Sequence, residues 1–149
     1  MRAVLQRVSD ASVSVDGQVV GQIGRGLLVY LGVAAGDDST DIEYIVSKIR
    51  DLRIFADADG KMNLSVADAA GAVLLVSQFT LCGDTRRGRR PSFDGAESST
   101  LARARYDDVL SSLRRTGLPV AAGVFQADMQ VTSVNDGPVT FLLDSSARS

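Results

Sequence analysis

The sequence predicts a mixed α/β (α+β) fold, in which a barrel-like sheet of mainly antiparallel strands is accompanied by two main helices. Alternating apolar residues fill most of residues 2–34 and return between 118 and 143, which is typical of strands. Two other segments, 37–50 and 98–117, carry apolar residues at helical spacing. Because hairpin-like strands flank the helices, this arrangement is favoured over a doubly wound parallel sheet.

The N-terminal part of the chain predicts a meander of strands. Val4, Gln6 and Val8 alternate between apolar and polar, and Asp16-Gly17 is typical of a tight turn. The run Leu27–Leu31 is apolar throughout, as in a strand that is buried on both faces. We therefore expect a meander that leads into a buried central strand.

Two segments predict helices. Asp37–Thr40 supplies capping side chains and acidic charge for a first turn, and the helix that follows should run to about Arg50. The second helix should begin at Ser98-Ser99 and end at Gly117, since glycine commonly terminates helices. Its amphipathic positions are Leu101, Arg105, Val109, Leu110 and Leu113.

Further strands are expected after the first helix and near the C-terminus. Arg53–Phe55 predicts a short strand, and Ala72–Leu81 predicts a second buried one, since Val73–Val76 is too continuously apolar for a solvent-facing edge. Residues 118–143 return to strand patterns. Asp136-Gly137 lies between two alternating runs, so we expect a hairpin turn there.

Length and composition fit a single domain spanning residues 1–149. A chain of this size, with 45% apolar residues, buries about 68–70% of its unfolded surface. No segment resembles a signal peptide or approaches the roughly 18 apolar residues of a membrane span, so we expect a cytoplasmic protein without a membrane partner. The single cysteine, Cys82, suits a reducing compartment and is interpreted as a small core residue.

The chain contains no histidine. This excludes Ser-His-Asp and Cys-His catalysis and removes the commonest zinc ligand. We therefore expect neither a metal nor a cofactor, and any hydrolysis must depend on carboxylates, backbone dipoles or the substrate itself. The net charge of −2 and the pI near 5.0 give no global attraction to nucleic acid, so a nucleic-acid partner would need a local basic patch.

Ser77–Thr80 places hydroxyl and amide groups directly after a buried apolar strand, where unpaired polar groups are costly. Taken alone, the segment is interpreted as a strand end whose hydroxyls bond to nearby backbone. Thr80 has no histidine to activate it, so we interpret it as structural or oxyanion-supporting rather than covalent. The backbone N–H groups of Phe79 and Thr80 are the candidates for an oxyanion hole.

A second unusual stretch, Asn135–Thr140, exposes backbone at Gly137-Pro138, and its proline cannot donate to a sheet ladder. Together, Ser77–Leu81 and Asn135–Thr140 resemble the two signature motifs of the D-aminoacyl-tRNA deacylases. The resemblance extends along nearly the whole chain, from Arg2–Val8 to Val139–Phe141.

The resemblance implies an esterase that releases D-amino acids from tRNA, and misplaced glycine as well, since glycine has no side chain to exclude. It implies a homodimer in which Gly137-Pro138, with a cis bond, enters the partner's pocket, holds the substrate amino group and crowds out an L side chain. The residues themselves leave the cis or trans state open. The resemblance also implies assistance by the terminal ribose 2′-OH, which predicts selectivity for RNA esters over deoxy analogues.

The family pattern assigns roles to positions of this chain. Catalytic residues come from the first motif: Ser77, Gln78, Phe79 and Thr80. Substrate-binding residues are Gly137, Pro138, Asn135, Phe125, Met129 and Arg7. Phe125–Met129 resembles a segment that lines the adenosine pocket, although both end residues suit a core equally well. Arg7 either supports the Gly-Pro loop or is an ordinary strand arginine.

Four arginines follow the first motif, namely Arg86, Arg87, Arg89 and Arg90. A solvated loop is the simplest interpretation, but guanidinium groups suit phosphates, so we expect contacts with the acceptor stem of tRNA and no DNA partner. Two alternatives stay open. One is a non-catalytic, dimeric RNA-binding module that uses this loop, and the other is a small-molecule hydrolase based on carboxylates, for which no acidic pair has a diagnostic spacing.

Overall fold

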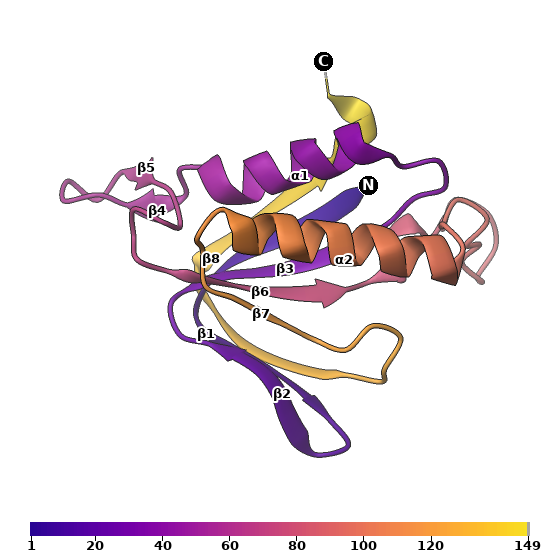
Figure 1. Ribbon diagram of the computed structural model, residues 1–149, viewed down its shortest axis with the longest axis horizontal. Coiled ribbons are helices and arrows are strands. Elements are labelled where there is room, and N and C mark those ends of the chain that lie inside the picture. Colours follow the sequence, from indigo (N-terminus) through magenta and orange to yellow (C-terminus); the bar gives the residue numbers. More distant parts are fainter. Residues whose placement is uncertain (149) are drawn as a thin grey trace.

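The protein is described by a computed structural model that covers residues 1–148 (Figure 1). The strands are β1 (Arg2–Val15), β2 (Gln18–Ile23), β3 (Gly26–Gly32), β4 (Phe55–Ala56), β5 (Met62–Leu64), β6 (Ala72–Ser77), β7 (Val120–Ala122) and β8 (Gln130–Asp144). The helices are α1 (Ser39–Asp51) and α2 (Ser99–Arg115), with short 3-10 turns η1 (Phe79–Cys82) and η2 (Ser145–Ala147).

Six strands form the main sheet, in the order β2-β1-β3-β6-β7, with β8 also paired to β1. β1 is antiparallel to β2, β3 and β8, whereas β3, β6 and β7 run parallel to one another. Parallel neighbours need a crossover connection, which α1 supplies between β3 and β6 and α2 supplies between β6 and β7. The predicted class, a mainly antiparallel sheet with two helices, is confirmed.

The sheet curls toward a barrel along β1. On one side of β1, residues 2–8 pair with β3 and residues 11–15 pair with β2. The second half of β1 and its partner β2 therefore curl back over the rest of the sheet. Gly21 of β2 thereby meets Ala122 of β7, and a Cβ at Gly21 would lie 2.5 Å from the Ala122 carbonyl oxygen. Only glycine allows two backbones to approach this closely. The barrel-like shape that the sequence predicts is therefore present.

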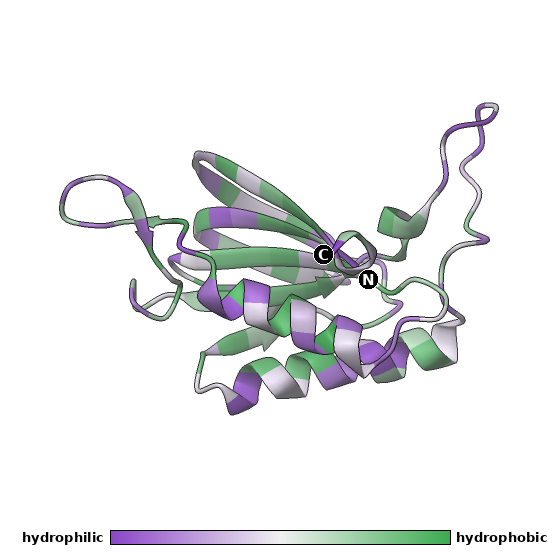
Figure 2. Ribbon diagram, turned by 90° about the horizontal axis from the view of Figure 1, so that it is seen from above, coloured by the Kyte–Doolittle hydropathy of each residue, from purple (hydrophilic) through white to green (hydrophobic). Residues whose placement is uncertain are grey.

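Both helices cover the same face of the sheet (Figures 1 and 2). Apolar side chains of β3 and β6 point alternately to this face and to the inside of the curl, as the period of a strand requires. Leu27 and Val29 pack under the helices, whereas Leu28 and Leu74 belong to a second cluster on the opposite face. The two strands are thus buried on both faces, as predicted from their continuous apolar runs.

The two helices begin where the sequence indicates. Asp38 caps α1, since its carboxylate accepts from the Thr40 N–H at 2.9 Å, and the Asp41 carboxylate reciprocally accepts from the Asp38 N–H at 2.9 Å. In α2 the inner face differs from the expectation, because Leu101 is 48% exposed. Ala102 and Tyr106 are buried in the first turns, one position later than the predicted Leu101 and Arg105, whereas Val109 and Leu113 are buried as predicted.

The expected hairpin turn at Asp136-Gly137 is wrong. β8 runs without a reversal from Gln130 to Asp144 and stays paired with β1. The pairing shifts inside it: Gln6 faces Thr140, but Val8 faces Asn135, so the segment between those partners bulges out of the ladder. A turn pair such as Asp-Gly serves a bulge as well as a hairpin, and only the pairing partner distinguishes the two.

Two strand boundaries also differ from the sequence prediction. The strand expected over Ala72–Leu81 ends at Ser77, and the chain turns through η1 directly afterwards. The short strand expected at Arg53–Phe55 is instead Phe55–Ala56, paired with β5 in a separate two-stranded sheet. Within residues 1–148, no helix has the length and apolar character needed to cross a membrane.

Candidate active site

A cavity of about 460 Å³ opens where β6 ends, between the first turns of α2 and the segment that precedes β8. The first motif contributes Ser77, Gln78 and Phe79 to its wall, and the predicted adenosine segment contributes Phe125 and Met129. Five predicted residues from two distant parts of the sequence therefore meet in one cavity. The other predicted residues do not line it: Thr80, Arg7, Asn135, Gly137, Pro138 and the four arginines.

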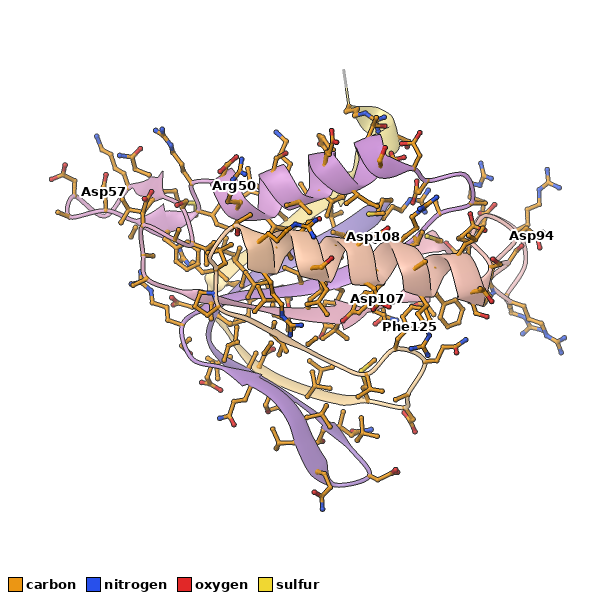
Figure 3. The ribbon with its side chains drawn as sticks, viewed as in Figure 1. Arg50, Asp57, Asp94, Asp107, Asp108 and Phe125 are labelled. Atoms are coloured by element: carbon orange, nitrogen blue, oxygen red, sulfur yellow. The ribbon has the colours of Figure 1, made fainter. Side chains whose placement is uncertain are left out.

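One wall of the cavity joins Tyr106 of α2 to Phe125 of the segment before β8, which Figure 3 labels. The ring centroids of Phe125 and Tyr106 lie 5.7 Å apart with the planes tilted by 49°, and the Arg103 guanidinium lies 4.9 Å from the centroid of Phe125. Aromatic rings and apolar side chains together make a mainly apolar surface. Such a surface suits a planar ligand such as a nucleobase.

The other wall is the turn that follows β6. The Gln78 N–H donates to the Leu31 carbonyl at 2.8 Å, and the Leu81 N–H donates to the Gln78 carbonyl at 3.2 Å. The N–H groups of Phe79 and Thr80 are the first in η1, so they have no acceptor within it. Among residues 1–148 no other hydrogen bond engages these two groups. They remain available to an external acceptor.

The Thr80 hydroxyl accepts a hydrogen bond from the side-chain amide of Gln78. An amide N–H is a donor and cannot remove a proton, so this contact does not activate the hydroxyl as a nucleophile. It does hold the side chains of Gln78 and Thr80 together on the turn. The contact agrees with a structural role for Thr80.

The second motif forms the bulge of β8. The Gly137-Pro138 peptide bond is cis. Gly137 has a φ of +127°, a backbone conformation that residues with a side chain rarely adopt. Arg7 of β1 is hydrogen-bonded to the bulge: its Nε donates to the Asp136 carbonyl at 3.2 Å. Its Nη1 donates to the Ile54 carbonyl at 2.9 Å. Arg7 therefore contacts the Gly-Pro segment directly.

The Asn135 side chain fixes the other end of the bulge. In the orientation that satisfies both ends of its amide, the nitrogen donates to the carbonyls of Arg7 at 2.9 Å and Val139 at 3.1 Å, and the oxygen accepts from the Thr140 hydroxyl at 3.0 Å. These bonds replace the ladder hydrogen bonds that the bulge interrupts. The bulge is thereby an ordered feature of the strand.

Within one chain, the bulge and the cavity lie far apart. Ser77 is level with Leu31 and Ala3 across the sheet, whereas the bulge lies between Gln6 and Val8 of β1. That is roughly 10–17 Å along the strands. On β8 itself, Val131 lines the cavity, and the bulge begins four residues later, roughly 13 Å further along the extended strand. The Gly-Pro segment of a chain therefore does not reach the cavity of the same chain.

A family model described as D-Tyr-tRNA(Tyr) deacylase matches residues 4–144. The chain belongs to this deacylase family. The D-aminoacyl-tRNA deacylase of Geobacter sulfurreducens is 55% identical over 149 residues, covering 100% of this chain and 98% of the relative. That of Anaeromyxobacter dehalogenans is 60% identical over 145 residues, covering 97% of each chain.

Solved structures resemble the deacylase as well. A protein described as c-Myc DNA Unwinding Element Binding Protein superimposes with a TM-score of 0.91 at 42% identity, covering 97% of this chain and 98% of the other. A probable eukaryotic D-amino acid tRNA deacylase has a TM-score of 0.81, with 95% and 97% coverage. Its identity is 20%, so it supports the fold alone.

The family establishes the class of reaction. The chain is an enzyme, a D-aminoacyl-tRNA deacylase, which hydrolyses the ester that joins an amino acid to tRNA. The non-catalytic RNA-binding module and the small-molecule hydrolase, both left open by the sequence, are therefore wrong. tRNA is accordingly the macromolecular substrate.

The arginine loop of the deacylase begins next to the cavity. Asp84 and Ser92 close its base through two backbone hydrogen bonds of 2.7 and 2.9 Å, and the hydrophilic loop extends away from the sheet (Figure 2). Arg86 pairs with Asp84 at 2.7 Å, and this contact lowers the pKa of the Asp84 carboxyl to about 2. Within the described part of the chain, the other three arginines are exposed and form neither hydrogen bonds nor ion pairs.

Sequence reasoning missed several residues of the cavity on and before α2. Ser99, Ala102 and Tyr106 line it from successive turns of the helix. Their spacing of three and four residues marks one helical face, which is the signal that could have identified them. Glu97 also lines the cavity, and its carboxylate accepts from the N–H groups of Ser98 at 2.8 Å and Gly36 at 3.1 Å, which lower its pKa.

The remaining titratable groups near the site do not indicate acid-base catalysis. Burial raises the pKa of Tyr106 to about 12, and its hydroxyl donates to the Leu75 carbonyl at 2.9 Å. Burial likewise raises the pKa of the Cys82 thiol. Across residues 1–148, no group of three or more carboxylates or thiols is placed to hold a metal ion.

Proposed function

We propose that this deacylase proofreads chirality through backbone groups alone, by cleaving D-aminoacyl and glycyl esters of tRNA in a cavity completed by a second subunit. The observation that carries the proposal is the pair of unengaged N–H groups at Phe79 and Thr80, beside a cavity wide enough for a nucleoside. A chain without histidine needs such a site, since it has no ordinary general base.

The terminal adenosine of tRNA is proposed to enter between Phe125 and Met129. The apolar wall and the flat ring of Phe125 support this placement, because bases stack on aromatic side chains. The ester carbonyl then lies near the turn after β6. Ser77 and Gln78 supply the polar edge of the cavity, and all four residues from Ser77 to Thr80 take part in holding the reacting group.

The chemical step needs little from side chains. Water attacks the ester carbonyl, the Phe79 and Thr80 N–H groups stabilise the oxyanion, and loss of one such donor typically costs about 10²–10³ in rate. The ribose 2′-OH next to the ester positions or activates the water. The tetrahedral intermediate then collapses, releasing the free amino acid and the 3′-OH of the tRNA.

The Gly137-Pro138 bulge of a second subunit is proposed to read the chirality. Its carbonyl oxygens accept from the substrate ammonium, and its backbone occupies the space that an L side chain needs. Arg7 and Asn135 hold this bulge in place through the hydrogen bonds described above. Glycine has nothing to exclude, so glycyl-tRNA is also cleaved.

Dimerisation follows from the position of the bulge. The Gly-Pro segment lies too far from the cavity of its own chain, so a composite site requires a partner, and a two-fold axis would complete two sites at once. We further propose that residues 1–149 act as one domain, in the cytoplasm, where aminoacyl-tRNA is used. The four arginines of the loop are proposed to contact the acceptor stem rather than DNA.

The test compares D-tyrosyl-tRNA, L-tyrosyl-tRNA and glycyl-tRNA, each at one enzyme concentration. We expect rapid release of D-tyrosine and glycine and negligible release of L-tyrosine. A D-tyrosyl ester on a tRNA that ends in 2′-deoxyadenosine should be cleaved far more slowly than the ribose form. Equal cleavage of the D and L esters would contradict chiral proofreading, and equal cleavage of the ribose and deoxyribose esters would contradict the role of the 2′-OH.

A further inference from the structure

Two aromatic side chains stand exposed at the mouth of the cavity. Phe79 is 59% exposed and Phe93 is 39% exposed, although phenylalanine is among the residues most often buried. Their ring centroids lie 5.0 Å apart, with the planes tilted by 59°. The two rings therefore form one defined apolar surface that faces solvent, which we call the aromatic pair.

The aromatic pair connects the cavity to the arginine loop. Phe79 lines the cavity. Phe93 directly follows Ser92, whose backbone closes the base of the loop against Asp84 at 2.7 and 2.9 Å. The aromatic pair therefore joins the wall of the cavity to the base of the arginine loop.

The loop on the far side of the pair carries unneutralised positive charge. Arg87, Arg89 and Arg90 are exposed, and within residues 1–148 none has an acidic partner, whereas Arg86 is held by Asp84. An apolar stacking surface beside free guanidinium groups is the combination that binds single-stranded nucleic acid. The arginines match phosphates, and the rings match bases.

We propose that the aromatic pair stacks on the unpaired nucleotide that immediately precedes the terminal adenosine of tRNA, while the free arginines contact the backbone phosphates leading to it. This inference rests on the proposed placement of the terminal adenosine in the cavity. It adds a second base-binding subsite, and it assigns to Phe93 a role in substrate binding. The occupant is a short single-stranded RNA segment, since the charge of the loop complements phosphates.

The experiment varies substrate length against Phe93. D-tyrosyl-adenosine fills only the cavity, whereas the D-tyrosyl ester of the trinucleotide cytidylyl-cytidylyl-adenosine also reaches the aromatic pair. For Phe93→Ala we expect kcat/KM on the trinucleotide ester to fall about 5- to 150-fold, the usual range for loss of one base-aromatic stack. On D-tyrosyl-adenosine the same variant should stay within about twofold of the unmodified enzyme. Phe79 is left unchanged because its N–H belongs to the proposed oxyanion hole.

Two further variants separate stacking from folding. Phe93→Tyr keeps the ring and should retain the preference for the trinucleotide ester, whereas Phe93→Leu keeps apolar bulk without a ring and should lose it. Equal loss on both substrates, or no loss on either, would overturn the inference while leaving the proposed function intact. A change of oligomeric state in Phe93→Ala, seen by sedimentation, would show that a second subunit covers the pair and would also overturn it. Inactivity of the unmodified enzyme on every D ester would instead reject the proposed function.

Discussion

Gly137 is the residue at which the proposed function depends most directly on backbone conformation. Its φ of +127° disfavours any side chain, and a Cβ there would lie 2.9 Å from Val139 Cγ2 and 3.0 Å from Arg7 Nη2. An added methyl group would therefore push against the guanidinium that supports the bulge. In the proposed site, the carbonyl oxygens next to this residue face the substrate ammonium of the partner's cavity.

For Gly137→Ala we expect a loss of about 1–3 kcal/mol in unfolding free energy and at least a tenfold fall in kcat/KM on D-tyrosyl-tRNA. The matched control is Gly60→Ala, which also has a positive φ, of +77°, but has no atom within 4 Å of the added Cβ. The control should lose about 1–2 kcal/mol and keep full activity. Chemical denaturation and deacylation kinetics measure the two effects, and equal activity of both variants would argue against a role for the bulge.

Thr80 gives the second prediction for a single residue. Its hydroxyl contacts only the Gln78 amide among side chains of the described residues, so Thr80→Ala removes one exposed hydrogen bond. We expect activity to fall about 2- to 12-fold, in proportion to a net 0.5–1.5 kcal/mol. Mass spectrometry of a quenched reaction should find no acyl-enzyme in the unmodified protein. Complete loss of activity in Thr80→Ala, together with an acyl group trapped on Thr80 of the unmodified protein, would make Thr80 a covalent nucleophile.

Among the elements of the fold, the start of α1 is tied to the C-terminal turn η2. Asp41 accepts from Arg148 Nη1 at 2.7 Å, as well as from the Asp38 N–H. Burial of Asp41 opposes its ionisation, but hydrogen bonds from Ser145, Asp38 and Arg148 outweigh this and hold the pKa below its usual range. A carboxyl whose folded pKa is depressed stabilises the fold above pH 4, and that stability is lost as the pH falls.

Asp41→Asn should therefore lower the unfolding free energy at pH 7 by about 1.5–3 kcal/mol, the value of hydrogen bonds to a charged group. The difference from the unmodified protein should shrink as the pH is lowered below about 4, because the carboxyl of the unfolded chain becomes protonated there while the folded carboxyl, with its lowered pKa, stays ionised. Asp107→Asn on the exposed face of α2 is the control (Figure 3), with an expected change within about 0.5 kcal/mol. Urea unfolding at pH 7 and pH 3 tests this, and a constant difference would contradict it.

The arginine loop is the second element that can be tested separately, through its proposed contact with tRNA. Replacing Arg87, Arg89 and Arg90 together by glutamine should reduce kcat/KM on D-tyrosyl-tRNA at moderate salt. The slope of log kcat/KM against log salt should become shallower by about 0.7 for each lost phosphate contact. Arg50→Gln is the control, because Arg50 pairs with Asp51 on α1, away from the loop. An unchanged slope in the triple variant would show that the loop does not contact the RNA backbone.

At the scale of the whole molecule, the cavity and the β8 bulge of one chain lie apart. The cavity lies at the end of β6, and the bulge lies on β8 beyond β3 and β1. In the proposed two-fold dimer, each bulge enters the cavity of the other chain, so that each active site draws on residues from two chains.

Mixing two inactive variants tests this directly. Gly137→Ala disables the bulge, and Ser99→Trp fills the cavity from α2. After denaturation and joint refolding, half of the dimers should be hybrids, each with one intact composite site, so about a quarter of the original activity should return. If each chain carried its own complete site, the mixture would be no more active than the mean of the two variants.

Local patterns predicted much of the fold. The caps at Asp38 and Ser98, the two-sided burial of β3 and β6, and the turn at Asp16-Gly17 all follow from residue type and spacing. At the start of α2 the buried residue was predicted one position early, because Leu101 is more apolar than Ala102, although Ala102 is the residue that packs in the core. Such errors arise where packing rather than hydrophobicity decides which side chain is buried.

The sequence by itself determined the class of chemistry, because the absence of histidine and the two motifs limit what the chain can do. It also determined where the two helices and the two buried strands β3 and β6 lie, since these follow from helical spacing and from continuous apolar runs. Only the tertiary structure decided that Asn135–Thr140 forms a bulge rather than a hairpin, and that Phe125 shares a cavity with Ser77. Both facts depend on pairing partners more than 40 residues away in the chain, and no local pattern contains that information.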